Sequence, residues 1–143
     1  MKQLNGLAAE LHDGISLAVM TATGSVMLLE GRGIMPLWRL YKEAPRALKG
    51  ALVADKVIGL GAAAVMAEAG IAACHAPAVS GKALDFLEKH GIKVYADDVP
   101  ENIINRSGTG PCPLESRLDG KKQSDYLAEI AAFVDDIVNG RPL

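Results

Sequence analysis

The sequence has few cysteines, few aromatic residues and no long apolar run. Its two cysteines, Cys74 and Cys112, form no disulfide pattern, so a disulfide-stabilised scaffold is excluded and a reducing compartment is expected. The longest apolar stretch, Val57 to Ala67, is shorter than the roughly 18 residues that a membrane span needs. The N-terminal residues lack the basic and apolar blocks of a secretory signal. We therefore expect a cytoplasmic protein that does not associate with membranes.

The chain also lacks a strong excess of charge of one sign. Its formal net charge is −2, which gives no support for a nucleic-acid polymer as a partner. The 143 residues suit a single domain, and no repeat or linker divides residues 1–143. Half of the residues are hydrophobic, but they are mostly small, and there are 15 glycines. Such a composition favours helices packed closely on a sheet.

Hydrophobic periodicity predicts a sequence of alternating helices and strands. The expected elements are a helix at 2–12, a hairpin of strands 15–20 and 25–30, a helix that begins near Leu37 and ends before Pro45, a buried helix at 55–69, a strand at 71–76, a helix capped by Ser80 that ends at His90, a strand at 92–96, a short strand near 103–104, a short helix from about Pro111, and an amphipathic helix at 124–139. Strand–helix–strand units cross over with a right hand, which makes their strands parallel. The prediction is a three-layer α/β/α sandwich with a mixed sheet, and with the final helix packed on that sheet.

Two stretches allow a comparison with a known fold. The buried helix is expected to follow Ala54-Asp55-Lys56, and the next helix follows Pro77-Ala78-Val79-Ser80-Gly81. The order of elements resembles the cytidine-deaminase-like fold, in which these two places carry a His/Cys-Ala-Glu triplet and a Pro-Cys-x-x-Cys motif that hold zinc. Here only the proline remains. The resemblance therefore implies a deaminase-like fold without its zinc ligands.

Three further stretches narrow this resemblance. They are residues 54–59, Ile104-Asn105-Arg106, and Gly110-Pro111-Cys112-Pro113-Leu114-Glu115. With these stretches, residues 11–120 resemble an uncharacterised prokaryotic family of unknown function with the same fold. The resemblance implies a fold but no activity.

The chain offers a poor set of metal ligands. Zinc needs three or four convergent cysteine, histidine or carboxylate ligands. Cys74 and His75 are neighbours on a predicted strand, so their side chains point to opposite faces. His12 and His90 each end a predicted helix and are expected to face solvent. Neither a metal nor another cofactor is expected.

The segment from Asn105 to Pro113 has the features of an anion-binding loop. Gly108 and Gly110 free the backbone to turn its amides inward, and the following helix start carries partial positive charge. Ser107 and Thr109 add hydroxyl donors, while Arg106 adds a guanidinium suited to phosphate or carboxylate. The alternative is an ordinary loop whose arginine pairs with Glu101 or Glu115.

Other candidates surround this loop. Asp55 is expected to cap the buried helix, and Lys56 beside it opposes the helix dipole, which suggests a bound anion. Gly59 and Gly61 within that helix suggest close approach by a strand or a ligand. Cys112 at a helix start is either an activated thiolate or an inert core residue, and Arg32 either reaches the cleft or is solvated. The candidate ligand-binding residues are thus Arg32, Asp55, Lys56, Asn105, Arg106, Ser107, Gly108, Thr109, Gly110, Cys112 and Glu115.

Three functions remain open from the sequence. The first is binding of a small anionic ligand, such as a nucleotide, by a deaminase-like domain without zinc. The second is a zinc-independent enzyme that uses Cys112 as nucleophile or Lys56 as acid or base. The third is a non-catalytic homodimeric domain, with Trp38, Leu40 and Tyr41 as the expected contact surface. A homo-oligomer is compatible with all three.

Overall fold

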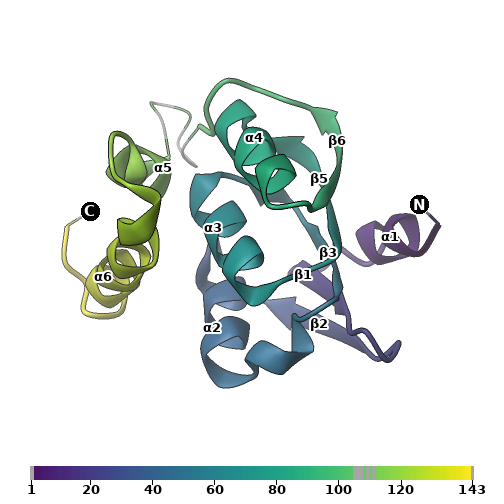
Figure 1. The fold of residues 1–143 in the computed structure, drawn as a ribbon. Helices are drawn as coiled ribbons and strands as arrows, with labels where there is room; N and C mark the ends of the chain where they lie inside the picture. The colour runs from purple at the N-terminus through teal and green to yellow at the C-terminus, as the bar shows by residue number, and fades with distance from the viewer. Residues whose placement is uncertain (1, 105–107, 109, 111, 143) are drawn as a thin grey trace.

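The computed structural model describes residues 2–104, 108, 110 and 112–142, and its strands form one mixed, open sheet (Figure 1). The strands are β1 (Ile15–Met20), β2 (Val26–Glu30), β3 (Leu52–Asp55), β4 (Val57–Ile58), β5 (Ala73–Val79) and β6 (Lys93–Asp98). Their order is β2-β1-β3-β5-β4, and β6 also pairs with β5. The strand β1 is antiparallel to β2 and β3, whereas β3, β4 and β6 are parallel to β5. The protein is therefore an α/β fold with a six-stranded mixed sheet.

A proline, Pro77, interrupts the pairing of β5 with its neighbouring strands. Strands β3 and β4 pair with β5 in one register, with Leu52 opposite Ala73 and Val57 opposite Ala78. This register places Lys56, which separates the two strands, opposite Pro77. The pairing of β5 with β6 also omits Pro77. Because proline has no N–H to donate, the ladder is interrupted there, and Lys56 is held at the interruption.

Helices cover both faces of the sheet. They are α1 (Lys2–Ala8), α2 (Met35–Glu43), α3 (Leu60–Ala69), α4 (Gly81–Lys89), α5 (Pro113–Leu118) and α6 (Tyr126–Val138), with short 3-10 turns at Pro45–Ala47 and Gln123–Asp125. On one face, Leu4 and Leu7 of α1 pack on the alanines of three strands. On the other face, α2, α3 and α4 enclose the main core, and α5 and α6 pack against α3 (Figure 1).

Several local predictions are confirmed. The first strand of the hairpin has the expected bounds and the second begins one residue later than expected, at Val26, while α2 ends at Glu43, before Pro45. Ser80 caps α4, since its hydroxyl oxygen accepts a hydrogen bond from the backbone N–H of Ala83 at 3.2 Å. No helix within residues 2–104 and 112–142 is long and apolar enough to cross a membrane.

Other predictions are wrong in position. The helix expected at 55–69 begins only at Leu60, because Asp55 belongs to β3 and residues 57–58 form β4, two strands that pair with β5. A short apolar run suits a buried strand as well as a buried helix, so periodicity alone does not separate them. The first helix ends at Ala8, and Ile104 forms one bridge instead of a strand. The final helix packs on α3 and α5, not on the sheet, because α3 already covers that face.

Candidate functional site

The described candidate residues lie at the carboxyl-terminal edge of the sheet, which is the end at which the parallel strands β3, β5 and β6 finish. Asp55 ends β3, and the helices α3 and α4 begin directly after β4 and β5. Arg32 lies at the same edge, because Glu30 at the end of β2 pairs with the first residue of the antiparallel β1. Loops at this edge of an open α/β sheet are the usual place for a ligand. The fold therefore brings Arg32, Asp55, Lys56 and the segment after β6 to one end of the molecule.

The carboxylate of Glu115 is the centre of this edge. Glu115 is only 3% exposed. Its Oε2 atom accepts hydrogen bonds from the backbone N–H of Leu60 at 2.9 Å and from the hydroxyl of Ser80 at 2.8 Å. Its Oε1 atom accepts one from the backbone N–H of Ile103 at 2.8 Å. One buried carboxylate thus joins the starts of α3 and α4 to the segment that follows β6.

This arrangement also explains how α3 begins. The residue before its first turn, Gly59, has no side chain to cap the helix. Glu115 supplies that cap from α5, and its negative charge suits the positive end of the helix dipole. The sequence predicted Glu115 only as a site residue and a possible partner of Arg106. The available signal for its larger role was a helix start that lacks its own capping side chain.

The two glycines at the start of α3 allow α5 to approach closely. A Cβ atom on Gly59 would lie 3.1 Å from Oε2 of Glu115, and one on Gly61 would overlap the side chain of Leu114. The close approach predicted from these glycines is therefore confirmed. Its cause is α5, and not the strand or ligand that the sequence suggested.

The loop predicted to bind an anion is closed at its base. The carbonyl oxygen of Ile103 accepts a hydrogen bond from the backbone N–H of Cys112 at 2.7 Å. The chain thus leaves and re-enters the fold at one place, beside Glu115. Within the loop, Gly108 is exposed with a φ of +72°, and Gly110 is partly buried. Asn105, Arg106, Ser107 and Thr109 lie outside the described residues, so their role stays a prediction.

Asp55 and Lys56 do not begin a helix, which corrects the capping prediction. Asp55 ends β3, and its Oδ1 atom accepts a hydrogen bond from the backbone N–H of Lys56 at 2.8 Å. Asp55 is 9% exposed, and burial raises its pKa to about 7, although hydrogen bonds from the N–H groups of Lys56 and Val57 oppose this rise. The Lys56 side chain is exposed. Lys56 therefore does not oppose a helix dipole, but it does lie at this edge.

The two stretches compared with the deaminase motifs also shift. The residues Ala54-Asp55-Lys56 belong to β3 and the interruption after it, while α3 opens at Gly59 and Leu60. Pro77 lies inside β5, and α4 opens at Ser80 and Gly81. The alignment of these motifs was therefore displaced by several residues.

The two cysteines differ in environment. Cys74 is completely buried, and burial together with the nearby Asp55 raises the pKa of its thiol to about 12. Cys112 is partly buried and packs against the main core. It precedes the six-residue α5 and makes no side-chain capping hydrogen bond.

The histidines are dispersed. Cys74 faces the main core, while the neighbouring His75 follows it on the strand and so points to the opposite face. His12 and His90 are exposed, as expected. Among the residues that the structure describes, no group of three or more histidine, cysteine or acidic side chains is placed to hold a metal ion.

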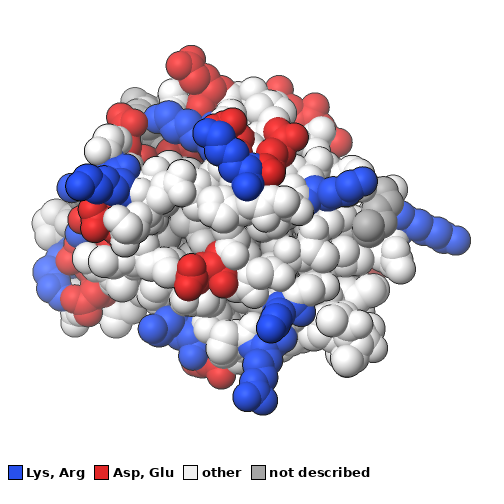
Figure 2. Space-filling model, in the orientation of Figure 1, with Lys and Arg blue, Asp and Glu red and all other residues white. Residues whose placement is uncertain are grey.

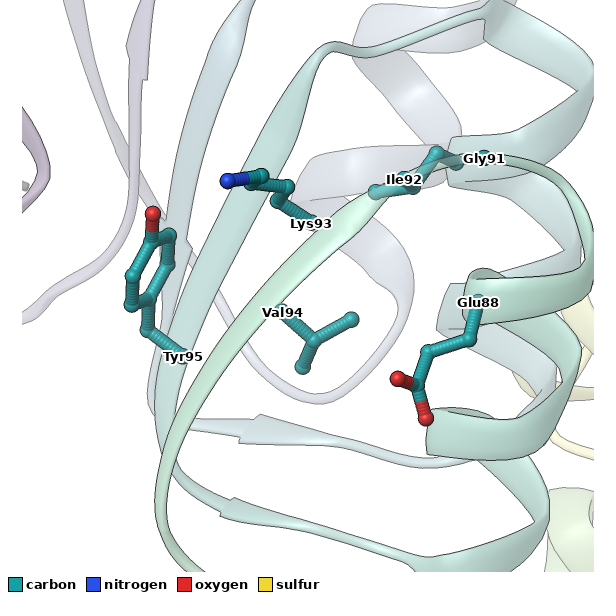
Figure 3. Close-up of a pocket in the computed structure, with 6 residues that line it drawn as sticks. All are labelled: Glu88, Gly91, Ile92, Lys93, Val94 and Tyr95. Atoms are coloured by element: carbon teal, nitrogen blue, oxygen red, sulfur yellow. The ribbon is translucent and has the colours of Figure 1, made fainter.

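One concavity lies away from this edge. It encloses about 390 Å³ and is lined by Glu88 and residues 91–95 (Figure 3). Because it adjoins the beginning of β6, it is at the opposite end of the sheet from the candidate residues. On the face of the molecule shown in Figure 2, basic and acidic side chains are interspersed.

Comparison with known proteins supports the fold and identifies the family. A crystal structure of a DUF1893 family protein (TM1506) from Thermotoga maritima is similar, with a TM-score of 0.79 and 22% sequence identity over 92% of this chain and 90% of that one. No curated protein matches. The family TM1506, a domain of unknown function (DUF1893), matches residues 7–137. Because this match spans nearly the whole sequence, the chain belongs to the DUF1893 (TM1506) family.

Proposed function

We propose that this protein binds a small anionic ligand, such as a nucleotide, at the edge where β3, β5 and β6 end. We further propose that its fold is a cytidine-deaminase-like three-layer arrangement that binds this ligand without zinc. The observation that carries the proposal is the set of hydrogen bonds around Glu115. They tie the base of the 103–112 loop to the starts of α3 and α4.

These hydrogen bonds support a location at one edge of the sheet for two basic residues, Lys56 and Arg106, that are distant in the sequence. Lys56 precedes Leu60 by four residues, and its side chain is exposed at the interruption between β3 and β4. Arg106 belongs to the loop whose two ends meet beside Glu115. The base of this loop, at Ile103 and Cys112, lies at the same edge as Lys56. The anchoring favours an ammonium and a guanidinium that act on one ligand.

The ligand chemistry follows from the donors at this edge. Lysine and arginine both form charge-assisted hydrogen bonds with phosphate or carboxylate. The backbone at Gly108 already has a left-handed conformation, which is compatible with a turn that presents amides. Ser107 and Thr109 would orient the anion, and Arg32 would contribute from the end of β2. In this proposal Glu115 positions the loop and does not itself contact the ligand.

Calorimetric titration of the full chain tests the proposal. The panel comprises nucleoside mono-, di- and triphosphates and inorganic phosphate. We expect at least one nucleotide to bind, and Lys56→Ala and Arg106→Ala each to weaken binding about tenfold or more, which corresponds to about 1.4 kcal/mol. Lys49→Ala is the matched control, because Lys49 is also exposed but precedes the opposite end of β3. Absence of binding at millimolar concentration, or equal binding by Lys56→Ala and the wild type, would refute the proposal.

A further inference from the structure

The sheet also has two lateral edges, formed by its outermost strands, and the sequences of these two strands differ. The strand β6, at one edge, reads Lys-Val-Tyr-Ala-Asp-Asp and carries three charged residues. The strand β2, at the other, reads Val-Met-Leu-Leu-Glu and has its single charge at the last position (Figure 1). In the sheet that the structure describes, β2 pairs only with β1. Natural proteins usually protect an open edge with charges or proline, because an unprotected edge pairs with another strand.

The side chains of β2 are also exposed where pairing would cover them. Val26 is 51% exposed and Leu28 is 44% exposed. Both point to the face of the sheet that α1 partly covers, since they pair with Met20 and Ala18 of β1. Met27 and Leu29 point to the main core and pack against it. The strand thus has one face fixed by the core and one apolar face in solvent.

The contact surface expected from the sequence, which is Trp38, Leu40 and Tyr41 on α2, is less exposed than β2. Leu40 is only 4% exposed and belongs to the core of the monomer. Trp38 and Tyr41 pack against the same core. The helix α2 therefore leaves little apolar surface for a partner, and β2 offers more.

We propose that two copies of this chain pair through their β2 strands, antiparallel, about a two-fold axis at Met27. Such an axis stands perpendicular to the sheet, so the α1-covered faces of both copies lie on the same side. Residues that face each other across the axis then have numbers that sum to 54. Val26 of each copy faces Leu28 of the other, and the two exposed side chains cover each other.

The distribution of charge favours a second copy as the occupant. In this register Glu30 faces the uncharged Gly24 of the partner, so no like charges oppose each other. The strand β6 instead carries Lys93, Asp97 and Asp98, and charged residues of this kind protect an edge from pairing. The β2 edge is thus complementary to itself in both apolar pattern and charge, and two copies form one continuous sheet.

Sedimentation and hydrogen exchange of the full chain test the proposal. We expect the wild type to dimerise reversibly in the micromolar range, and the backbone amides of residues 24–31 to exchange more slowly as protein concentration rises. Val26→Lys and Leu28→Lys place charges at the two-fold contact, so each should raise the dimer dissociation constant at least tenfold with an unchanged circular dichroism spectrum. Val138→Lys is the matched control, because Val138 is 68% exposed on α6, away from β2.

A cross-link tests the register. A mixture of the Val26→Cys and Leu28→Cys variants should form a disulfide-linked dimer under mild oxidation, and the Leu28→Cys variant alone should form much less. A wild type that stays monomeric at several hundred micromolar would overturn the proposal. A dimer that survives both lysine variants, or that shows no concentration-dependent protection of residues 24–31, would also overturn it. The hydrogen-exchange arm uses the unmodified protein, so it decides the question even if a variant fails to fold.

Discussion

The carboxylate of Glu115 accepts a hydrogen bond from the backbone N–H of Leu60, a residue 55 positions earlier in the chain, at 2.9 Å. The same oxygen accepts a bond from the Ser80 hydroxyl. A carboxylate that accepts from two buried donors and one partly buried donor is strongly held, and its loss would leave those donors without partners. Glu115 is therefore the residue on which the geometry of this edge most depends.

Replacement of Glu115 should destabilise the protein strongly. Glu115→Gln keeps the shape but removes the charge, and we expect the free energy of unfolding to fall by about 2–4 kcal/mol in urea denaturation. Glu115→Ala should cost at least as much, and millimolar formate or acetate should restore part of the loss by binding to the same donors. Glu101→Gln is the control, because Glu101 is exposed in the nearby segment. A Glu115→Gln protein as stable as Glu101→Gln would contradict this account.

Because α3 and α5 are in close contact, alanine substitution at two helical glycines should change the free energy of unfolding in opposite directions. Gly61→Ala introduces a methyl group that overlaps Leu114, so the free energy of unfolding should fall by about 1–3 kcal/mol. Gly6→Ala in α1 has open space around the added Cβ atom and should raise it by about 0.5–1 kcal/mol.

A double variant separates the steric cause from a general helix effect. Combined with Leu114→Ala, the Gly61→Ala change should cost less than it does alone, because the overlapping side chain is gone. Strictly additive effects of the two changes would show that the overlap is not the cause.

Asp55 should make stability depend on pH in an unusual direction. Burial raises its pKa from 3.8 to about 7, so the folded state holds a proton that the unfolded state releases. The stabilisation from this proton is complete below about pH 4 and is lost as the pH rises toward 7. Asp55→Asn should therefore gain stability relative to the wild type across this range, by at least about 1 kcal/mol, with no further change above it.

This comparison uses the difference between two proteins, so other titrating groups cancel. Urea denaturation of wild type and Asp55→Asn between pH 4 and 8 provides the measurement. A difference that is constant with pH would show that Asp55 has an ordinary pKa in the folded state.

The two cysteines should differ in reactivity. Cys74 is buried and its thiol pKa is raised to about 12, so it should not react with iodoacetamide in the folded protein at pH 7.5. Cys112 is partly exposed and should react, and mass spectrometry of the alkylated protein counts the modified sites. Both should react in denaturant. A rate at Cys112 far above that of a free peptide thiol would favour the nucleophilic function, and modification of Cys74 under native conditions would contradict the description of the core.

Local signals in the sequence predicted much of the fold. The turn between residues 21 and 24 fixed the hairpin, and Ser80 followed by a helical stripe fixed the start of α4. Both features depend only on residues near each other in the chain. The interruption at Lys56 was not predicted, because it depends on Pro77 of a neighbouring strand, which lies 21 positions away.

The membership of the candidate site stays a prediction, and its structure did not follow from the sequence. The residues Arg32, Asp55, Lys56 and Glu115 were placed in one site, and the topology brings them to one edge of the sheet. The role of Glu115 as the cap of α3 depends on a contact over 55 positions, which local patterns do not encode. The misplaced start of α3 had a similar origin, since the strands β3 and β4 form through pairing with strands that are distant in the sequence.

The central claim is that the 103–112 loop and the Lys56 segment act on one anionic ligand. Nuclear magnetic resonance tests it most directly, through a titration of the uniformly ¹⁵N-labelled chain with the nucleotide that binds most tightly. The account predicts that the amide signals of Lys56, Gly108 and Gly110 shift together and saturate with one dissociation constant, and that Lys56→Ala weakens all three responses. Shifts confined to one of the two segments, or the absence of shifts at millimolar nucleotide, would contradict it.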